Sequence, residues 1–307
     1  MESARGNRIT EVLRTLQQNT SGPQRISHRF GRRGEFGIRV ASTIEDRLAA
    51  WRLAYRVYRR EGYAPQHHSG LWYSIFDALP QTVTCTAEQD RRTIGAITLV
   101  PDSPLGLPAE ETFPEEVAAL RAAGARMAES VALVQDCQAE RAGARVVNKL
   151  LELTCLVPAR VLKCTHMICT VNPRHARYYT RLMRFRQRGG LRNCARVSAA
   201  PAVFLVLAMR DVRRHVLQAR KPGTRRTLYR SFISEDQSEA LASEIRRRHR
   251  PLAPAELRTY FAEQRRLLQE LATPSLQHLA RQYPGYDFET IIRSERENGT
   301  RELEAVS

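Results

Sequence analysis

Near the middle of the chain lies the run Ala128-Glu129-Ser130-Val131-Ala132-Leu133-Val134, in which Glu129 is the only charge. A short run this apolar predicts a strand that is buried on at least one face. Even a neutral polar group costs roughly 2–7 kcal/mol to bury without a partner, and a carboxylate costs more. Glu129 is therefore expected either to belong to a structural ion pair or to line a cavity in which it does chemistry.

Strand and helix patterns alternate on both sides of this run. Strands are predicted at residues 37–41, 82–87, 93–99, 126–134, 165–171 and 201–209. Helices are predicted at residues 44–60, 110–123, 141–157 and 173–183, with Thr43 as the cap of the first and Pro158 ending or kinking the third. The polar segment 88–92 predicts a hairpin, whereas the helix 141–157 predicts a parallel crossover between its two flanking strands. This order predicts an α/β fold with a mixed sheet flanked by helices.

The two ends of the chain differ from this core. Residues 1–36 are polar and rich in arginine, which predicts a flexible basic arm with one short helix at residues 7–18. Residues 37–210 carry the α/β pattern. Residues 211–307 have little strand character and predict a helical C-terminal extension. Its helices are expected at residues 234–249, 254–271 and 275–282, followed by a charged tail at 293–307.

The composition is strongly basic. The 307 residues have a formal net charge of +17, and only three of the 49 cationic side chains are lysines. This charge indicates an acidic partner, such as a nucleic acid, an anionic membrane surface, a phosphate-bearing ligand or an acidic protein, although a plain compositional bias toward arginine is the alternative. The absence of long apolar runs and of C-x-x-C pairs among the six cysteines indicates a cytoplasmic protein with free thiols.

Four segments, 75–82, 94–108, 127–133 and 171–185, resemble the long-chain N-acyl amino acid synthases. The most specific are the loop Asp102-Ser103-Pro104-Leu105-Gly106-Leu107-Pro108 and the helix start Asn172-Pro173-Arg174-His175. Each motif alone is weak, but the combination is specific, and the resemblance covers roughly residues 37–210. That family has the GNAT-type acyltransferase fold and is related to the acyl-homoserine-lactone autoinducer synthases. The resemblance therefore implies a GNAT-like mixed sheet flanked by helices.

The resemblance also implies an activity, which is transfer of a long-chain fatty acyl group from an acyl carrier protein thioester to the amine of an amino acid. The donor would enter as a substrate on its 4'-phosphopantetheine arm, and no tightly bound cofactor is expected. Acyl carrier protein is acidic, which agrees with a basic enzyme surface. The lipid product could also bring the enzyme to a membrane surface, and no nucleic acid partner is expected.

Glu129 is the candidate general base of such a reaction. Amine attack on a thioester needs a neutral amine, a polarised carbonyl and a fixed geometry, but no covalent enzyme nucleophile. A carboxyl group in an apolar strand should have a raised pKa, which suits proton acceptance from an ammonium group. Arg126 lies three residues away, on the opposite face of a regular strand, so an ion-pair partner would have to come from another element.

The donor site is expected between strands 126–134 and 165–171, which part in this fold to admit the pantetheine arm. Backbone amides near Val131, Leu133 and Val134 would then polarise the thioester carbonyl. Relatives that use CoA bind its pyrophosphate on a glycine-rich loop at a helix N-terminus. The corresponding segment here, Gln138-Ala139-Glu140-Arg141-Ala142-Gly143, has Arg141 where the first glycine belongs, and this favours a carrier-protein donor.

Further residues are assigned to the donor site. Arg141, Arg145 and Lys149 recur every four residues on one helix face, so they could bind the phosphate of the arm or acidic side chains of the carrier, or else form a solvated stripe. Asn172 is assigned to the same site. Tyr179, favoured over its neighbour Tyr178, would protonate the leaving thiolate, with core packing as the alternative role.

The acceptor pocket is assigned to Tyr58, Trp72, Phe76 and Asp77, on the helix and loop that shape this pocket in relatives. Asp77 could hold the ammonium group of the amino acid or could cap the turn before Pro80.

Other functions are weighed against this one. The acceptor could be another amine, as in autoinducer-like or exopolysaccharide-associated enzymes. The basic runs 220–230 and 246–250 would support a non-enzymatic nucleic-acid-binding protein, but no helix-turn-helix or RNP pattern accompanies them. A catalytically inactive module that binds acyl groups or the carrier is a third alternative. The histidines and cysteines near residues 67–68 and 164–169 match no usual zinc spacing, so no metal site is predicted.

Overall fold

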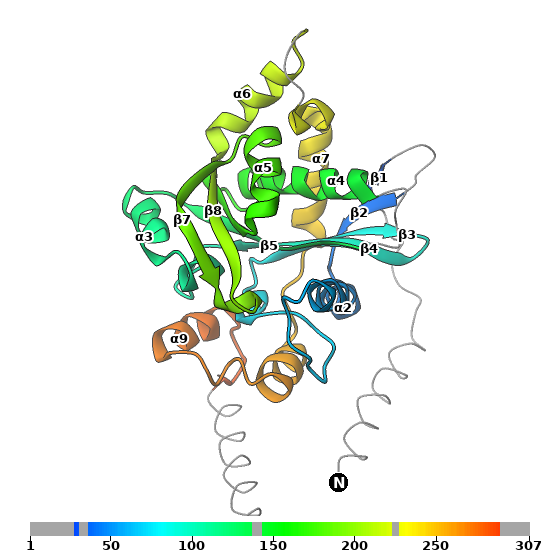
Figure 1. The fold of residues 1–307 in the computed structure, drawn as a ribbon. Coiled ribbons are helices and arrows are strands. Elements are labelled where there is room, and N and C mark those ends of the chain that lie inside the picture. The colour runs from blue at the N-terminus through cyan, green and yellow to red at the C-terminus, as the bar shows by residue number, and fades with distance from the viewer. Residues whose placement is uncertain (1–27, 31–35, 137–142, 223–226, 289–307) are drawn as a thin grey trace, which may run out of the picture.

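A mixed sheet of eight strands forms the centre of the protein (Figure 1). The computed structural model describes residues 28–30, 36–136, 143–222 and 227–288. The sheet order is β1-β2-β3-β4-β5-β6-β8-β7, and only β5 and β6 run parallel. The strands are β1 (His28–Phe30), β2 (Phe36–Val40), β3 (Val83–Gln89), β4 (Arg92–Pro101), β5 (Met127–Gln135), β6 (His166–Val171), β7 (Arg186–Cys194) and β8 (Ala200–Ala208). The predicted mixed sheet is confirmed.

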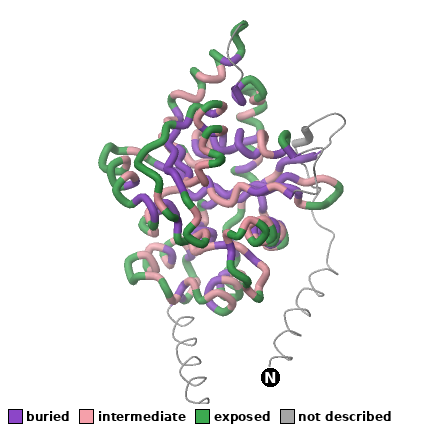
Figure 2. The backbone as a smooth tube through the Cα atoms, in the orientation of Figure 1, coloured by how far each residue is buried: buried purple, intermediate pink, exposed green. Residues whose placement is uncertain are grey.

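Helices cover both faces of this sheet. Helix α2 (Ile44–Arg60) lies on one side, and α4 (Gly143–Leu156) and α5 (Pro173–Leu182) lie on the other (Figure 1). The remaining helices are α3 (Pro114–Ala122), α6 (Met209–Ala219), α7 (Glu235–Arg248), α8 (Pro254–Leu257) and α9 (Thr273–Gln282). Figure 2 shows buried backbone along the central strands and exposed backbone on the outer helices. None of the helices in the described ranges is long and apolar enough to cross a membrane.

Several local predictions are confirmed. Thr43 caps α2, where its hydroxyl accepts a hydrogen bond from the Asp46 N–H (3.3 Å). Strands β3 and β4 form the predicted hairpin, and the two residues of its turn, Asp90 and Arg91, have φ values of 49° and 64°, as the twist-matched type I′ turn requires. Helix α4 ends at Leu156, and Pro158 lies in the π-helical turn that follows (Val157–Val161).

Two predicted helices are wrong in extent. The segment 110–123 is divided into a 3₁₀ turn (Pro108–Glu111) and α3, because Phe113 precedes Pro114 and adopts a non-helical conformation (φ −130°, ψ 52°). The segment 254–271 is helical only through α8 and a π-helical turn (Arg258–Gln264).

Strands β1 and β7 and helix α6 were not predicted from the sequence. Strand β7 is exposed along nearly its whole length, so its sequence has no apolar alternation to reveal it. Strand β1 lies inside the segment predicted as a basic arm. The predicted helix at 7–18 and the charged tail at 293–307 lie outside the described residues.

The C-terminal extension is part of the same hydrophobic core. Tyr229 and Ile245 pack in the core cluster on the α4 face of the sheet. Leu257, Phe261 and Leu279 pack in the cluster on the α2 face, with Trp51, Tyr73 and Met127 among their cluster partners. Residues 227–288 therefore complete both layers of the fold.

Candidate active site

The parallel strands β5 and β6 part in the middle of the sheet. Their pairing is limited to Met127 with His166, Ala128 with Met167 and Glu129 with Ile168, although β5 continues to Gln135 and β6 to Val171. The predicted gap between these strands is confirmed, and Glu129 is the last residue of β5 that pairs across it.

A β-bulge bends β5 away from its parallel neighbour. Ala96 pairs with Val134 and Thr98 with Val131, so Ala132 and Leu133 together face the single residue Ile97. Ala132 has a φ of 50°, in the left-handed region. Bulges of this kind break the regular ladder and redirect the strand. Beyond Glu129, the edge of β5 that faces β6 has no strand partner among the described residues.

A cavity of about 690 Å³ occupies this gap and reaches both faces of the sheet. On the α2 face its walls include Trp51, Tyr73, Asp77, Thr112 and Arg196. On the α4 face they include Val147, Thr170, Asn172, Tyr178 and Tyr179. The cavity is thus a passage between two chemically different ends, one rich in aromatic and charged groups and one formed by α4, β6 and α5.

Glu129 lies in the wall of this cavity and is only 2% exposed. Its Oε2 accepts a hydrogen bond from the Ala109 N–H (2.7 Å). Burial raises the pKa of its carboxyl group to about 8, while the Ala109 hydrogen bond and the Arg196 charge act in the opposite direction. The predicted rise in pKa is confirmed. Among the residues that the structure describes, no cation forms an ion pair with Glu129, so the alternative of a sealed ion pair does not hold there.

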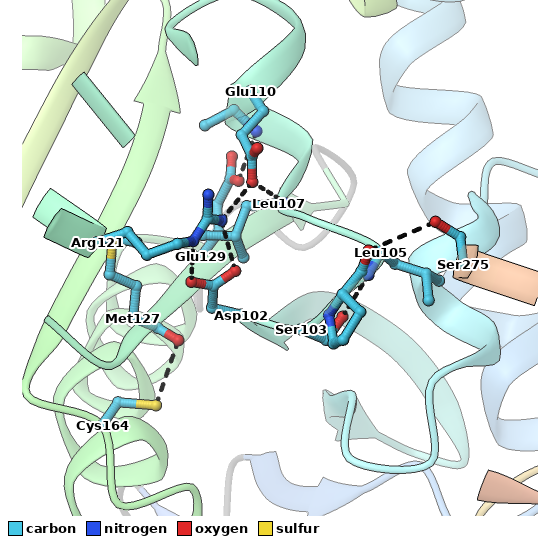
Figure 3. Close-up of polar contacts among 12 residues, drawn as sticks. Asp102, Ser103, Leu105, Leu107, Glu110, Arg121, Met127, Glu129, Cys164 and Ser275 are labelled. Carbon is cyan, nitrogen blue, oxygen red and sulfur yellow. Dashed lines mark hydrogen bonds and ion pairs between the residues drawn. The ribbon is translucent and has the colours of Figure 1, made fainter. Parts of the chain in front are cut away.

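The loop singled out by its sequence supports Glu129 (Figure 3). Arg121 binds Asp102 through Nε and Nη2 (3.0 and 2.7 Å) and binds Glu110 Oε1 (2.6 Å). Glu110 also accepts a hydrogen bond from the Leu107 N–H (2.8 Å). Gly106 has a φ of 78°, so a side chain there would be strained, and its Cβ would lie 2.9 Å from the Glu110 carboxylate, which would have to move. These contacts hold Ala109 against Glu129.

The two tyrosines of α5 both reach the cavity. The Tyr178 hydroxyl donates to Asn148 Oδ1. Tyr179 is more deeply buried, packs edge to face on Phe185 (ring centroids 5.6 Å apart), and burial raises its pKa. The raised pKa keeps this hydroxyl protonated at neutral pH, and it makes no hydrogen bond within the described part of the chain, so its proton is available for donation.

The acceptor residues predicted from the sequence are brought together with one exception. Tyr58, Trp72 and Asp77 line the cavity, and the Tyr58 and Trp72 rings meet edge to face at 5.0 Å. Phe76 is buried and is not part of the lining described; Arg196 lies over its ring at 5.7 Å. Asp77 accepts hydrogen bonds from Trp51 Nε1 (3.1 Å), from the Ser74 N–H (2.9 Å) and from the Ser74 hydroxyl (3.2 Å), which is the capping role.

The predicted donor residues are only partly assembled. Val131, Leu133, Val134 and Asn172 line the cavity, and Asn172 caps α5 by accepting from the Arg174 N–H (3.1 Å). Lys149 instead binds Glu152 (2.8 Å) and the Ser231 carbonyl (3.0 Å), away from the lining. Arg145 is exposed on the surface of α4. Arg141 lies outside the described residues, as does most of the degenerate loop 138–143.

Sequence reasoning missed other cavity residues, among them Trp51, Thr112 and Arg196. Arg196 comes from the short turn (Ala195–Val197) between β7 and β8. No sequence signal placed it, because the polar strand β7 that positions the turn was itself not recognised. Within the described residues, no group of three or more histidine, cysteine, aspartate or glutamate side chains could hold a metal ion.

The sheet is mixed, its parallel strands part, and a bulge lies beside the gap. A buried carboxylate, Glu129, lies where the two strands separate. This is the layout of an N-acyltransferase of the GNAT fold. The chain belongs to the family of N-acyl amino acid synthase FeeM, whose family model matches residues 49–208. It is an acyltransferase enzyme.

One solved structure agrees with this assignment. The structure of FeeM, an N-acyl amino acid synthase from uncultured soil microbes, is 25% identical with a TM-score of 0.51, and the match covers 57% of this chain and 93% of that one. An acyl-CoA N-acyltransferase from Pseudomonas aeruginosa is 14% identical with a TM-score of 0.37, over 56% of this chain and 98% of that one. No curated protein matches the chain.

Proposed function

We propose that this enzyme transfers a long-chain fatty acyl group from the 4'-phosphopantetheine thioester of an acyl carrier protein to the α-amine of an amino acid. The observation that carries the proposal is a buried carboxyl group with a pKa of about 8 at the origin of a two-ended cavity. The family match supports the N-acyl amino acid product. Acyl carrier protein supplies the thioester from the α4 and α5 end, and the amino acid enters from the α2 end.

Glu129 acts as the general base. Amino acids bring their amine mostly as ammonium at neutral pH, so a proton must leave before the nitrogen can attack. Ionised Glu129 takes that proton, directly or through a water, and a carboxyl group with a pKa near 8 is well matched to the task. The Ala109 N–H occupies only one acceptor position of the carboxylate, so others remain for the ammonium group.

The transfer itself breaks one bond and forms one. The amine nitrogen attacks the thioester carbonyl carbon, while backbone amides near Val131, Leu133 and Val134 stabilise the developing oxyanion. Collapse of the tetrahedral intermediate breaks the C–S bond, and the attacking nitrogen releases its second proton to solvent, which leaves a neutral amide. Glu129 returns the first proton to solvent before the next cycle. The pantetheine thiolate takes a proton from Tyr179, whose hydroxyl is then reprotonated from solvent.

An acidic carrier protein is favoured as donor by charge. The net charge of +17 gives the enzyme an electrostatic attraction for an acidic partner, and such steering raises association rates. The predicted contribution of Arg141, Arg145 and Lys149 to carrier binding is retained only for Arg141 and Arg145, because Lys149 is held by Glu152. A carrier-protein donor also agrees with a cytoplasmic reaction.

The first prediction concerns this activity. Purified protein incubated with long-chain acyl carrier protein and individual amino acids should yield N-acyl amino acids detectable by mass spectrometry. For the wild type, kcat/KM should rise with pH through a midpoint of about 8, because the carboxyl group must be ionised to act. Glu129→Gln should lose roughly 10²–10⁴-fold of this rate and the pH dependence with it.

One control variant and two possible negative results make this experiment decisive. Asp77→Asn alters the other buried carboxyl group of the cavity and should keep the limb near pH 8. Full activity of Glu129→Gln would refute the general-base role alone, whereas no acylated product from any amine with folded protein would refute the proposed reaction.

A further inference from the structure

Arg196 stands out among the cationic side chains of the cavity. The other cationic groups in the described lining, Arg174 and His175, lie at the start of α5, on the donor side. There Arg174 is bound to Glu61 (2.6 Å), and burial lowers the pKa of His175, which keeps it neutral. Arg196 comes instead from the β7–β8 turn, on the face of the sheet that carries Glu129.

The guanidinium of Arg196 retains unused hydrogen-bond donors. Its side chain is 22% exposed, and one contact is made by Nη1, to Glu111 Oε1 at 3.1 Å. Within the described residues no other donor of this guanidinium has a partner. Guanidinium groups bind carboxylates in a two-pronged geometry, which needs donors of this kind.

The position of Arg196 relative to Glu129 matches an α-amino acid. Both side chains line the cavity and contact the same 3₁₀ turn (Pro108–Glu111), because Glu129 accepts from the Ala109 N–H and Arg196 binds Glu111. The Arg196 charge also lowers the pKa of the Glu129 carboxyl group. An α-amino acid carries its ammonium and its carboxylate on the same carbon atom. A ligand whose ammonium group faces Glu129 therefore has its carboxylate within reach of a cation at the same end of the cavity.

We propose that Arg196 forms an α-carboxylate subsite, which makes the acceptor end of the cavity selective for amino acids over simple amines. This inference rests on the proposed function, because it assumes that Glu129 faces the acceptor amine. Glu111 holds the guanidinium from its solvent side, and the ring of Phe76 lies beneath it at 5.7 Å. The subsite is thus pre-oriented before the substrate arrives.

The chain offers a matched control arginine four residues earlier. Arg192 lies over Phe113 (5.1 Å) and is bound to Glu116 (2.9 Å), much as Arg196 lies over Phe76 and is bound to Glu111. Arg192 is outside the described cavity lining. Arg192→Gln therefore removes the same kind of ion pair and ring contact at a residue outside the lining. It also removes a hydrogen bond to the Thr112 carbonyl (2.9 Å), but it leaves Arg196 and its contacts with Glu111 and Phe76 in place.

The test compares an amino acid with its α-amide, which lacks the carboxylate charge. The wild type should prefer the amino acid, and Arg196→Gln should raise the KM for the amino acid by about 10- to 100-fold while leaving that for the amide unchanged. Arg196→Lys should recover part of the preference, because it restores the charge without the two-pronged geometry. Arg192→Gln should behave as the wild type.

Binding supplies a second readout that needs no acyl transfer. The chain has two tryptophans, Trp51 and Trp72, and both line the cavity, so their fluorescence reports ligand binding directly. The amino acid should quench this fluorescence more than its amide does, and this selectivity should be lost in Arg196→Gln and kept in Arg192→Gln. Such a result supports the subsite even if no acyl product forms and the proposed reaction fails. The subsite is overturned if the amino acid and its amide change the fluorescence of the wild type equally, or if Arg196→Gln keeps the selectivity.

Discussion

Two buried carboxyl groups line the cavity, and their contacts separate their roles. Burial raises the pKa of both Asp77 and Glu129. Asp77 accepts three hydrogen bonds, from Trp51 and from two groups of Ser74, and so it holds the loop before β3 in place. Glu129 accepts one hydrogen bond, from Ala109. Glu129 therefore has more acceptor capacity left for a substrate proton than Asp77 has, and this difference supports the proposal of Glu129 as the general base and of Asp77 as a structural cap.

The raised pKa of Glu129 makes the stability of the folded protein depend on pH, and Glu129→Gln should reveal this dependence. The carboxyl group titrates near its ordinary pKa of 4.5 in the unfolded chain but at about 8 in the folded protein. Between these values the unfolded state releases a proton that the folded state keeps, so the free energy of unfolding falls by roughly 1.4 kcal/mol per pH unit as pH rises. Glu129→Gln should abolish this fall in the free energy of unfolding, so its melting temperature at pH 8 should be higher than that of the wild type.

The measurement is thermal unfolding of both proteins between pH 5 and pH 9, with Asp77→Asn as the control. Asp77→Asn should be less stable than the wild type across the whole range, because it weakens a cap and a bond to a buried indole. A Glu129→Gln protein that is less stable than the wild type at pH 8 would contradict the assignment of Glu129 as an unpaired buried acid.

At the scale of elements, two irregular segments create the site. The bulge at Ala132 and Leu133 turns β5 away from β6, and the loop after β4 brings the Ala109 N–H to Glu129. Arg121 of α3 ties both ends of that loop together through Asp102 and Glu110. Arg121 is thus a positioning residue for Glu129, although it does not touch it.

Arg121→Met should therefore shift the pH profile. Losing both ion pairs loosens the loop and weakens the Ala109 hydrogen bond, which normally lowers the pKa of Glu129. The ascending limb of kcat/KM should move to higher pH, and activity at pH 7 should fall about threefold, as expected for half a pKa unit. Arg126→Met is the matched control, because Arg126 donates to the Lys163 carbonyl and not to this loop. An unchanged limb in Arg121→Met would show that the loop holds Ala109 without it.

The secondary-structure elements differ in how well the sequence alone predicts them. Apolar strands, the β3–β4 hairpin, the parallel crossover and the anomaly of Glu129 were all predictable, because each leaves a local pattern of apolar or turn residues. Strand β7 was not, since it is an exposed edge strand held by backbone pairing to β8. Arg196 and the Ala109 N–H were not predictable either. They reach the site through irregular connections, whose course depends on tertiary contacts.

At the scale of the whole molecule, the C-terminal extension packs behind the wall of the cavity on the α2 face. The Tyr73 hydroxyl donates to the Tyr260 carbonyl (2.5 Å), and Phe261 meets the rings of Trp51 and Tyr73 edge to face at 6.2 and 5.2 Å. Farther along, the Tyr283 hydroxyl donates to the Ala78 carbonyl (2.7 Å) and Ser275 to the Pro104 carbonyl (3.4 Å). None of the described residues after Ala202 lines the cavity, so the extension acts through the residues that do.

Phe261→Ala tests this support. The side chain is fully buried, so its removal should cost about 3–5 kcal/mol of stability. It should also raise the KM for the amino acid roughly tenfold, because Trp51 and Tyr73 lose their backing and the acceptor is held less precisely. Phe288→Ala is the matched control, since Phe288 is buried in the same extension but contacts Tyr283 and Tyr286. Tyr283 in turn bonds to Ala78, which is not part of the described lining, whereas Phe261 contacts the lining residues Trp51 and Tyr73 directly. Both variants should melt at lower temperature than the wild type, whereas only Phe261→Ala should change the acceptor KM at a temperature where all three proteins are folded. Equal changes in KM would mean that the extension contributes stability alone and does not position the acceptor.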